Sequence, residues 1–440
     1  MKKIMLFSSF LLIAFFSQAQ VLPKLKERVK QKIEARTNEK VDKTVDTAFN
    51  KAERKVDNTV KGKPGAKNKN DGSVSDSTKK DDAATVTSTS FKTYSKYDFV
   101  PGEKVIMYED FTKDNIGDFP DKWNTNGSGE IVTVNKAVGR YLMTKKLVVM
   151  YPEWVKNLPD NFTLEFDLMT TDKFSYYSGW FIVGVTTNTD IGKNFRNFSR
   201  FGDGRISNGG GFEIAFHPEN AGGLQGLTFA YSSNNEKEVL KNEADQNQLM
   251  VPQKTFCHIS IWRQKNRVRV YMNDKKVWDL PKLVADGLNL NSVYFRNDGA
   301  TNEEDSYYLG NIRVAVGAPD TRNKLITEGK FVTRGILFDV NSDKIKPESY
   351  GAVKDIANVL KENSDVKVQI IGHTDSDGDE AKNLELSKKR AEAVKQFLIK
   401  EFGIDEIRIT TDGKGESQSS DSNTTPEGKA NNRRVEFIKI

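Results

Sequence analysis

The sequence has little cysteine, little histidine and few long apolar runs. Its 440 residues include one cysteine, Cys257, and three histidines. A single cysteine cannot form a disulfide within the chain or a cysteine-based metal site, and we expect Cys257 to be a small buried apolar residue. The histidines (His217, His258 and His373) are far apart and show no ligand spacing. We therefore expect no metal centre and no cofactor.

Only the first residues of the chain carry a long apolar run. Lys2-Lys3 is followed by the apolar run Met5 to Phe16 and by the small-residue site Ser17-Gln18-Ala19. This pattern predicts a secretory signal peptide over residues 1–19. A retained membrane anchor is the alternative, but the run is short for a bilayer span. We expect no transmembrane helix further along and, because no cysteine follows the cleavage site, no lipid anchor.

Positive charge is concentrated in the segment after the signal peptide. Residues 21–70 hold fifteen Lys/Arg against seven Asp/Glu, whereas the whole chain has a net charge of +6. Apolar residues recur every four positions, as in Leu25, Val29 and Ile33, so residues 20–62 are predicted to form a charged amphipathic helical segment. Residues 21–62 could contact a membrane surface, or they could be a solvated spacer; we expect no nucleic-acid partner.

Residues 63–94, rich in Lys, Asn, Gly, Ser and Thr, are predicted to be a disordered linker.

Residues 95–318 show short alternating segments separated by turn signals. In Phe162 to Leu168 the apolar residues occupy every second position, which is typical of a half-buried strand. Asn273-Asp274-Lys275 is a predicted hairpin turn between two further strands. We predict an all-β, jelly-roll-like sandwich. The run Trp262 to Trp278 resembles the hairpin of laminin-G or concanavalin-like domains, and a glycan or protein is the expected ligand.

A glycan hydrolase is the alternative function for this sandwich. Glu165 and Asp167 share one face of the predicted strand, and paired carboxylates are the usual acid and nucleophile of such enzymes. In concanavalin-like glucanases a third carboxylate follows on the same strand, but the corresponding residue is Met169. We therefore expect a protein that is not an enzyme.

After a connector over residues 319–329, residues 330–440 alternate strand and helix patterns. Ile336 to Asp339 is a predicted short strand, Pro347 a predicted helix start, and Glu380 to Phe402 a predicted helix that Gly403 ends. Further strands are expected at Val366 to Gly372, Ile407 to Thr410 and Val435 to Ile440. This order predicts an α/β sandwich.

Arg390 places a charge on the apolar side of the predicted helix. On a helical wheel it shares a sector with Leu386, Ala393, Val394 and Phe397. A charge there must be paired or must line a site. One interpretation is a simple salt bridge with Asp375, at the end of the preceding strand. The other is a divided pair, in which Asp375 binds an ammonium and Arg390 a carboxylate of one zwitterionic ligand.

The motifs of this region resemble the OmpA C-terminal-like domain. They are Gly372-His373-Thr374-Asp375, Asn383, Leu386-Ser387-Lys388-Lys389-Arg390-Ala391, Gly413-Lys414-Gly415-Glu416 and Asn432-Arg433-Arg434-Val435-Glu436, together with the opening Ile336-Leu337-Phe338-Asp339, Ser342 and Ile345-Lys346-Pro347. The resemblance covers nearly all of residues 330–440. It implies non-covalent binding of peptidoglycan through the diaminopimelate of the stem peptide, in the periplasm, by a protein associated with the outer membrane and cell wall.

The same resemblance implies which residues form the site. The family's key aspartate and arginine correspond to Asp375 and Arg390, and its supporting asparagine and threonine to Asn383 and Thr374. Arg433 and Arg434 match the terminal motif. The acidic loop that begins at Asp375 has some features of a calcium loop, but its glycine and its twelfth residue, Leu386, do not fit one.

Overall fold

The computed structural model of the chain describes residues 97–440, apart from 146, 194–209, 222, 224, 236, 300–304 and 318–319. The predicted signal peptide (1–19), charged helical segment (20–62) and linker (63–94) lie outside the described residues. All of the described residues belong to one compact unit, Ser90–Ile440.

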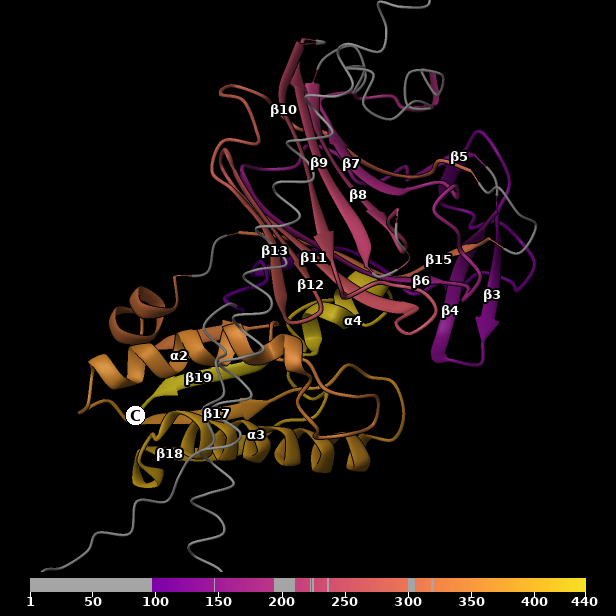
Figure 1. The fold of residues 1–440 in the computed structure, drawn as a ribbon. Helices are drawn as coiled ribbons and strands as arrows, with labels where there is room; N and C mark the ends of the chain where they lie inside the picture. Colours follow the sequence, from indigo (N-terminus) through magenta and orange to yellow (C-terminus); the bar gives the residue numbers. More distant parts are fainter. Residues whose placement is uncertain are drawn as a thin grey trace, which may run out of the picture. The chain divides into compact units, whose positions relative to one another are not determined.

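Two antiparallel sheets form the first part of this unit (Figure 1). One sheet has the order β13-β12-β11-β6-β15-β4-β3, with β1 paired to β15. Its strands are β1 (Lys104–Glu109), β3 (Glu130–Val134), β4 (Ala137–Thr144), β6 (Asn161–Thr170), β11 (Phe256–Gln264), β12 (Arg267–Met272), β13 (Lys275–Leu280) and β15 (Tyr307–Val316).

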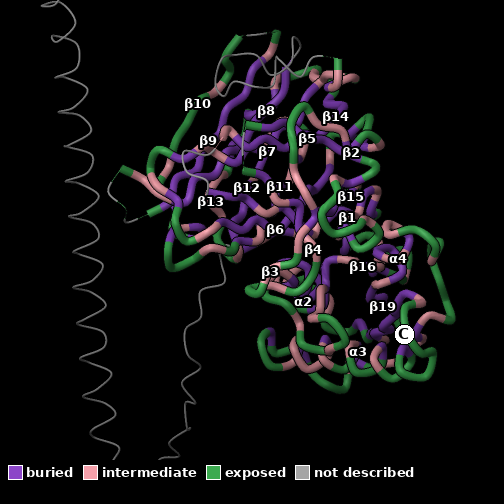
Figure 2. Tube along the Cα trace, turned by 90° about the vertical axis from the view of Figure 1, so that its right-hand side faces the viewer, coloured by how far each residue is buried: buried purple, intermediate pink, exposed green. Residues whose placement is uncertain are grey.

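The second sheet has the order β10-β9-β8-β7-β14-β5-β2. Its strands are β2 (Trp123–Thr125), β5 (Val148–Pro152), β7 (Phe181–Thr186), β8 (Gly210–His217), β9 (Gly226–Asn234), β10 (Lys237–Gln246) and β14 (Ser292–Asn297). The edge strand β10 is largely exposed and charged (Figure 2), which protects the edge from pairing with other chains.

A single apolar core joins the two sheets and confirms the prediction of an all-β sandwich. The alternating residues of β6 (Phe162, Leu164, Phe166 and Leu168) are all fully buried in it. Phe166 packs edge-on against Phe295 of the other sheet, with ring centroids 5.4 Å apart, an arrangement that aromatic rings favour. Cys257 is buried in the same core, as predicted.

The predicted hairpin is also confirmed. Met272 of β12 lies opposite Lys275 of β13, so the turn has two residues, Asn273 and Asp274. Asn273 has a φ of 52°, a left-handed conformation that asparagine tolerates.

The C-terminal part is a four-stranded sheet with helices, in the strand order β16-β19-β17-β18. Strands β17 and β18 are parallel and the other pairs are antiparallel. The strands are β16 (Lys330–Thr333), β17 (Val368–Gly372), β18 (Ile409–Gly413) and β19 (Val435–Lys439), and the helices are η3 (Pro347–Ser349), α2 (Tyr350–Glu362), α3 (Glu380–Phe402), η4 (Glu406–Arg408) and α4 (Pro426–Asn432).

Helix α3 begins and ends where the sequence predicts. The side chain of Asp379 accepts a hydrogen bond from the Lys382 N–H, and Gly403 ends the helix with a φ of 67°. These are standard N-cap and C-cap contacts. Helix α2 packs against α3 through Tyr350, whose ring contacts Phe397 and Phe402.

Several features of this part differ from the sequence prediction. The strand predicted at Ile407 to Thr410 starts only at Ile409, because residues 406–408 form η4, and β16 was not predicted. Residues 336–339 do not form a strand, because the backbone of Leu337 bonds to Ser349 and Lys346 instead of to the sheet. Helix α4 was not predicted; Thr425 caps it, and Pro426 occupies its first turn. The connector contains the helical turn η2 (Asn323–Thr327), whose Leu325 is buried in the C-terminal core.

Segments of the same compact unit cover the outer face of β6. The Gly102 N–H donates to Thr163 Oγ1 of β6 at 3.1 Å, and Phe99 packs edge-on against Tyr271 of β12. Helix α2 contacts this covering segment so closely that a Cβ added to Gly351 would lie 2.0 Å from the carbonyl oxygen of Phe99. The sandwich and the C-terminal sheet are therefore packed together.

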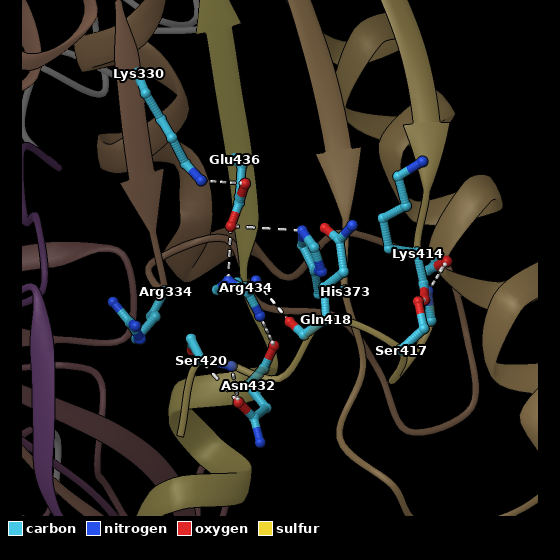
Figure 3. A network of polar contacts seen from close by, with 12 residues as sticks. Lys330, Arg334, His373, Lys414, Ser417, Gln418, Ser420, Asn432, Arg434 and Glu436 are labelled. Atoms are coloured by element: carbon cyan, nitrogen blue, oxygen red, sulfur yellow. Dashed lines mark hydrogen bonds and ion pairs between the residues drawn. The ribbon is translucent and has the colours of Figure 1, made fainter. Parts of the chain in front are cut away.

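A buried polar network fixes the C-terminal strand β19 (Figure 3). Glu436 is 5% exposed and accepts contacts from Lys330 at 2.7 Å and Arg434 at 2.9 Å, with His373 3.5 Å away. Burial alone would raise the pKa of Glu436. The contacts with His373 and Lys330 and the charge of Arg434 outweigh burial, and they hold this pKa well below its ordinary value.

The lowered pKa of Glu436 predicts loss of stability in acid. Because the folded pKa is below the unfolded one, this stabilisation is complete above about pH 4.5 and is lost as the pH falls toward the folded value. Glu436→Gln should lower the free energy of unfolding by about 3 kcal/mol at neutral pH, since it leaves the buried guanidinium of Arg434 without its carboxylate partner. It should also flatten the decline below about pH 4.5. Urea denaturation across pH measures both effects, with the exposed Glu401→Gln as control. Parallel pH profiles for Glu436→Gln and the native chain would contradict this assignment.

Gly351→Ala is predicted to loosen the packing of α2 on residues 97–102. Alanine normally stabilises a helix relative to glycine by up to about 1 kcal/mol, but the overlap with Phe99 should outweigh this gain and cost about 1–3 kcal/mol. Denaturation midpoints measure the difference. Asn358→Ala, on the exposed side of α2, is the matched control, and a Gly351→Ala variant as stable as this control would refute the contact.

Candidate functional site

The candidate site lies where β17 ends and the chain turns toward α3. Two backbone hydrogen bonds hold the turn: the His373 N–H donates to the Arg434 carbonyl and the Thr374 N–H to the Gly415 carbonyl, both at 3.0 Å. At Gly372 a side chain would collide with the carbonyl oxygen of Ser387 in α3, 2.2 Å from an added Cβ. Glycine thus allows the close approach of helix and strand that carries Asp375 to the site.

Asp375 is 8% exposed and both of its carboxylate oxygens have partners. Oδ1 accepts the Asp377 N–H at 3.3 Å, and Oδ2 forms an ion pair with Nη1 of Arg433. The interpretation of a simple Asp375–Arg390 salt bridge is therefore wrong. The partner of Asp375 is an arginine at the C-terminal end of α4.

Arg390 is half-buried at the margin of the buried side of α3. The fully buried positions of this helix are Asn383, Ser387, Ala391, Val394, Leu398 and Phe402, so Arg390 lies beside the apolar stripe and not at its centre. Its Nε donates to the carbonyl oxygen of Ser342 at 3.0 Å, and its guanidinium carbon lies 4.9 Å from the ring centroid of Phe338. Among the described residues, its contacts are with a carbonyl and an aromatic ring, and none is an ion pair.

The charges around Arg390 act on its guanidinium in opposite directions. Burial, followed by the like charge of Arg433, lowers the pKa of Arg390, while Asp375 and Asp343 act to raise it. Arg390 is therefore a partly desolvated cation without a bonded carboxylate. Burial and the like charge of Arg433 disfavour the charged form of Arg390. An anionic ligand would stabilise that charged form, so the group favours an anion.

Asn383 and Thr374 support the same loop. Asn383 Nδ2 donates to Glu416 Oε2 at 2.6 Å and to the Asp377 carbonyl at 3.1 Å. Thr374 is buried, and its hydroxyl has no hydrogen-bond partner among the described residues. Asn383 therefore fixes the loop, whereas the Thr374 hydroxyl is a buried polar group without a partner among the described residues.

The structure separates the two adjacent arginines of the terminal motif. Arg433 joins Asp375 in the site, and its guanidinium carbon lies 5.0 Å from the ring centroid of Tyr108 in β1. Arg434 turns the other way, into the Glu436 network, where it also donates to the carbonyl of Gln418 at 2.9 Å (Figure 3). The structure thus brings together five of the six predicted site residues (Thr374, Asp375, Asn383, Arg390 and Arg433).

Sequence reasoning missed the groups that other segments bring to the site. Tyr108 comes from the sandwich, and Ser342 and Phe338 from the loop after β16. No local pattern marks Tyr108, because its contact joins distant segments of the chain. Phe338 and Ser342 belong to the opening motif of the family resemblance, but they were not predicted as site residues. Glu416, which accepts the bond from Asn383, lies within the Gly413 to Glu416 motif. That motif could have indicated its role near the site.

The acidic loop after Asp375 uses its carboxylates within the protein. Asp377 pairs with Lys429 and Asp379 caps α3. Within the part of the chain that the structure describes, no group of three or more His, Cys, Asp and Glu side chains could hold a metal ion.

Glu165 and Asp167, the carboxylates of the hydrolase alternative, are buried on β6. His258 lies between them, 2.7 Å from Asp167 and 3.7 Å from Glu165, and Arg313 pairs with Glu165 at 3.3 Å. Burial would lower the pKa of His258, but its bonds to Asp167 and Glu165 outweigh burial and raise that pKa to about 10. These carboxylates are neutralised by buried cations, which argues against this pair as acid and nucleophile.

Comparison with known proteins identifies the C-terminal region. Residues 337–433 match the OmpA family model. Outer membrane porin F of Pseudomonas aeruginosa is 41% identical over 101 residues, which are 23% of this chain and 29% of that protein. The peptidoglycan-binding protein ArfA of Mycobacterium bovis is 39% identical over 108 residues, which are 24% of this chain and 33% of that protein. The chain thus spans about a third of the length of these relatives.

A solved structure, the cell wall anchor of the T6SS from Pseudomonas aeruginosa, is 29% identical with a TM-score of 0.23 and covers 25% of this chain and 80% of that chain. In the described residues, no helix is both long and apolar enough to cross a membrane. The family match, from Leu337 to Arg433, covers strands β17 and β18 and helices α2, α3 and α4. The chain therefore carries an OmpA family domain in its C-terminal part.

Proposed function

We propose that the C-terminal domain binds peptidoglycan non-covalently through the diaminopimelate of the stem peptide. The free end of that residue is zwitterionic. In this proposal Asp375 accepts its ammonium, and Arg390 binds its carboxylate through the terminal nitrogens of the guanidinium. The name of the relative ArfA, a peptidoglycan-binding protein, supports the ligand class.

The observation that carries the proposal is the unequal pairing of the two residues. Among the residues that the structure describes, Arg390 bonds only through Nε to a carbonyl, and its guanidinium lies on the ring of Phe338. Asp375 is held by Arg433 and by a backbone N–H. The cation of Arg390 has no bonded carboxylate, and the carboxylate of Asp375 is fixed nearby. This pair of opposite charges is complementary to a zwitterion. Since Asp375 and Arg390 do not pair with each other, Arg390 can bind the carboxylate of the ligand, and Asp375 keeps lone pairs that Arg433 and the Asp377 N–H do not use to accept the ammonium.

The other predicted site residues receive different roles. Thr374 and Asn383 would support the loop, and Arg433 would orient Asp375. Arg434 is committed to Glu436 and Gln418, so we assign it an indirect role in fixing β19 beneath the site.

For the whole protein we propose a non-catalytic envelope component. It would be exported by the signal peptide over residues 1–19 and would act in the periplasm, where it would link the outer membrane to the cell wall. The name of the relative porin F, an outer membrane protein, supports this location. Residues 21–62 would contact a membrane surface, and residues 63–94 would act as a flexible tether.

We further propose that the sandwich is a concanavalin-like jelly roll whose ligand is a glycan or a protein. Its two antiparallel sheets and the two-residue hairpin at Asn273-Asp274 support this assignment. The buried ion pairs of Glu165 and Asp167 support binding over hydrolysis.

Asp375→Asn and Arg390→Ala are each predicted to weaken binding to purified peptidoglycan sacculi by about ten-fold or more, since each removes a charge-assisted bond of about 1.5–3 kcal/mol. Asparagine keeps the shape of the aspartate but loses its charge and replaces one acceptor oxygen with an amide donor. Co-sedimentation of the full chain with sacculi measures the affinity.

Lys389→Ala is the matched control for Arg390→Ala. Lys389 is the preceding residue of α3, is exposed, and pairs with Glu385 at 2.7 Å. Its loss should leave binding unchanged. Undiminished binding by both Asp375→Asn and Arg390→Ala would rule out this site.

A further inference from the structure

The edge of the sandwich is fastened to the domain that carries the candidate site. Strand β1 pairs with β15 on one side. On its other side, the amide of Asn431 from α4 both accepts from the Val105 N–H and donates to the Val105 carbonyl, each at 3.0 Å. Asn431 is 2% exposed. The oxygen and the nitrogen of this buried amide thus bond the N–H and the carbonyl of one residue of β1. A neighbouring strand would satisfy the same two backbone groups.

Further contacts fix the same junction. Ala430 packs with Val105 and Ala315. The guanidinium of Arg334, next to β16, donates to the Glu103 carbonyl at 2.6 Å and to the Asn431 carbonyl at 3.0 Å. The C-terminal end of α4 therefore has a defined position on β1.

This junction also sets the position of Arg433. Arg433 follows Asn431 by two residues, and Tyr108 follows Val105 by three on β1. The guanidinium of Arg433 lies over the Tyr108 ring, with its carbon 5.0 Å from the ring centroid, while Nη1 binds Asp375. One guanidinium thus joins an aromatic ring of the sandwich to the carboxylate of the site.

We propose that the ligand site is composite: β1 of the sandwich, through Tyr108, positions Arg433 and thereby Asp375 for the ligand. This inference rests on the proposed function. The ring binds the face of the guanidinium and holds Arg433 at one side of Asp375. Without the ring, Arg433 is free to bind both carboxylate oxygens and to compete with the ligand's ammonium. Tyr108 is a positioning residue, and the sandwich tunes the affinity of the neighbouring domain.

The test is a double-mutant cycle on the full chain. The probe is a synthetic stem tripeptide that ends in diaminopimelate, and its Kd is measured by calorimetry. Tyr108→Ala should weaken binding about five-fold or more, and Tyr108→Phe, which keeps the ring, should stay within about two-fold of the native chain. In an Arg433→Ala background, Tyr108→Ala should have no further effect, because it acts through Arg433.

Controls separate positioning from folding. Tyr177→Ala, at an exposed tyrosine of the sandwich, should bind like the native chain. If Tyr108→Ala unfolds, Tyr108→Leu keeps bulk without the aromatic face and should show the same loss. Two outcomes would overturn the composite site alone. One is native affinity in a folded Tyr108→Ala or Tyr108→Leu variant. The other is an equal loss of affinity on Tyr108→Ala in the native and the Arg433→Ala backgrounds. Failure of the native chain to bind the tripeptide would overturn the proposed function as well.

Discussion

The ion pair between Arg433 and Asp375 is the interaction on which the candidate site depends. It occupies one side of the carboxylate, and within the described part of the chain Arg390 has only a carbonyl and an aromatic ring as partners. A cation and an anion that could neutralise each other are thereby kept apart. The arrangement costs stability, because Arg390 is partly buried without a counter-ion. A zwitterionic ligand would restore the missing pair, so the same arrangement gives a reason for specific binding.

The contact between the sandwich and the C-terminal domain also depends on buried polar groups that pair with one another. Arg313 of β15 pairs with Glu165 and also donates to the Arg334 carbonyl at 3.1 Å. Arg334 in turn bonds to Glu103 and Asn431. Buried polar groups stabilise little in net terms, but leaving one unpaired costs much. The network therefore favours one docking arrangement, and that arrangement places Tyr108 next to Arg433.

Local signals in the sequence were enough to predict the elements that frame the site. Gly403 marks the end of α3, and the alternating pattern of β6 gives the residues that it buries in the core. These local signals did not predict the conformation of residues 336–339, where Leu337 bonds to Ser349 instead of to the sheet. They also did not predict the position of Arg390, which lies beside the apolar stripe of α3. The Arg433–Asp375 pair and the role of Tyr108 depend on contacts between distant segments. Neither periodicity nor propensity encodes such contacts, so these features required the structure.

A crystal structure of the full chain with the diaminopimelate tripeptide is the most direct test of the central claim, that Asp375 and Arg390 bind opposite charges of one ligand. The account predicts the ligand's ammonium within hydrogen-bond distance of Asp375, its carboxylate on Arg390, and Arg433 still stacked on Tyr108. A ligand bound elsewhere, or an Asp375 that pairs with Arg390 while the ligand is bound, would contradict it.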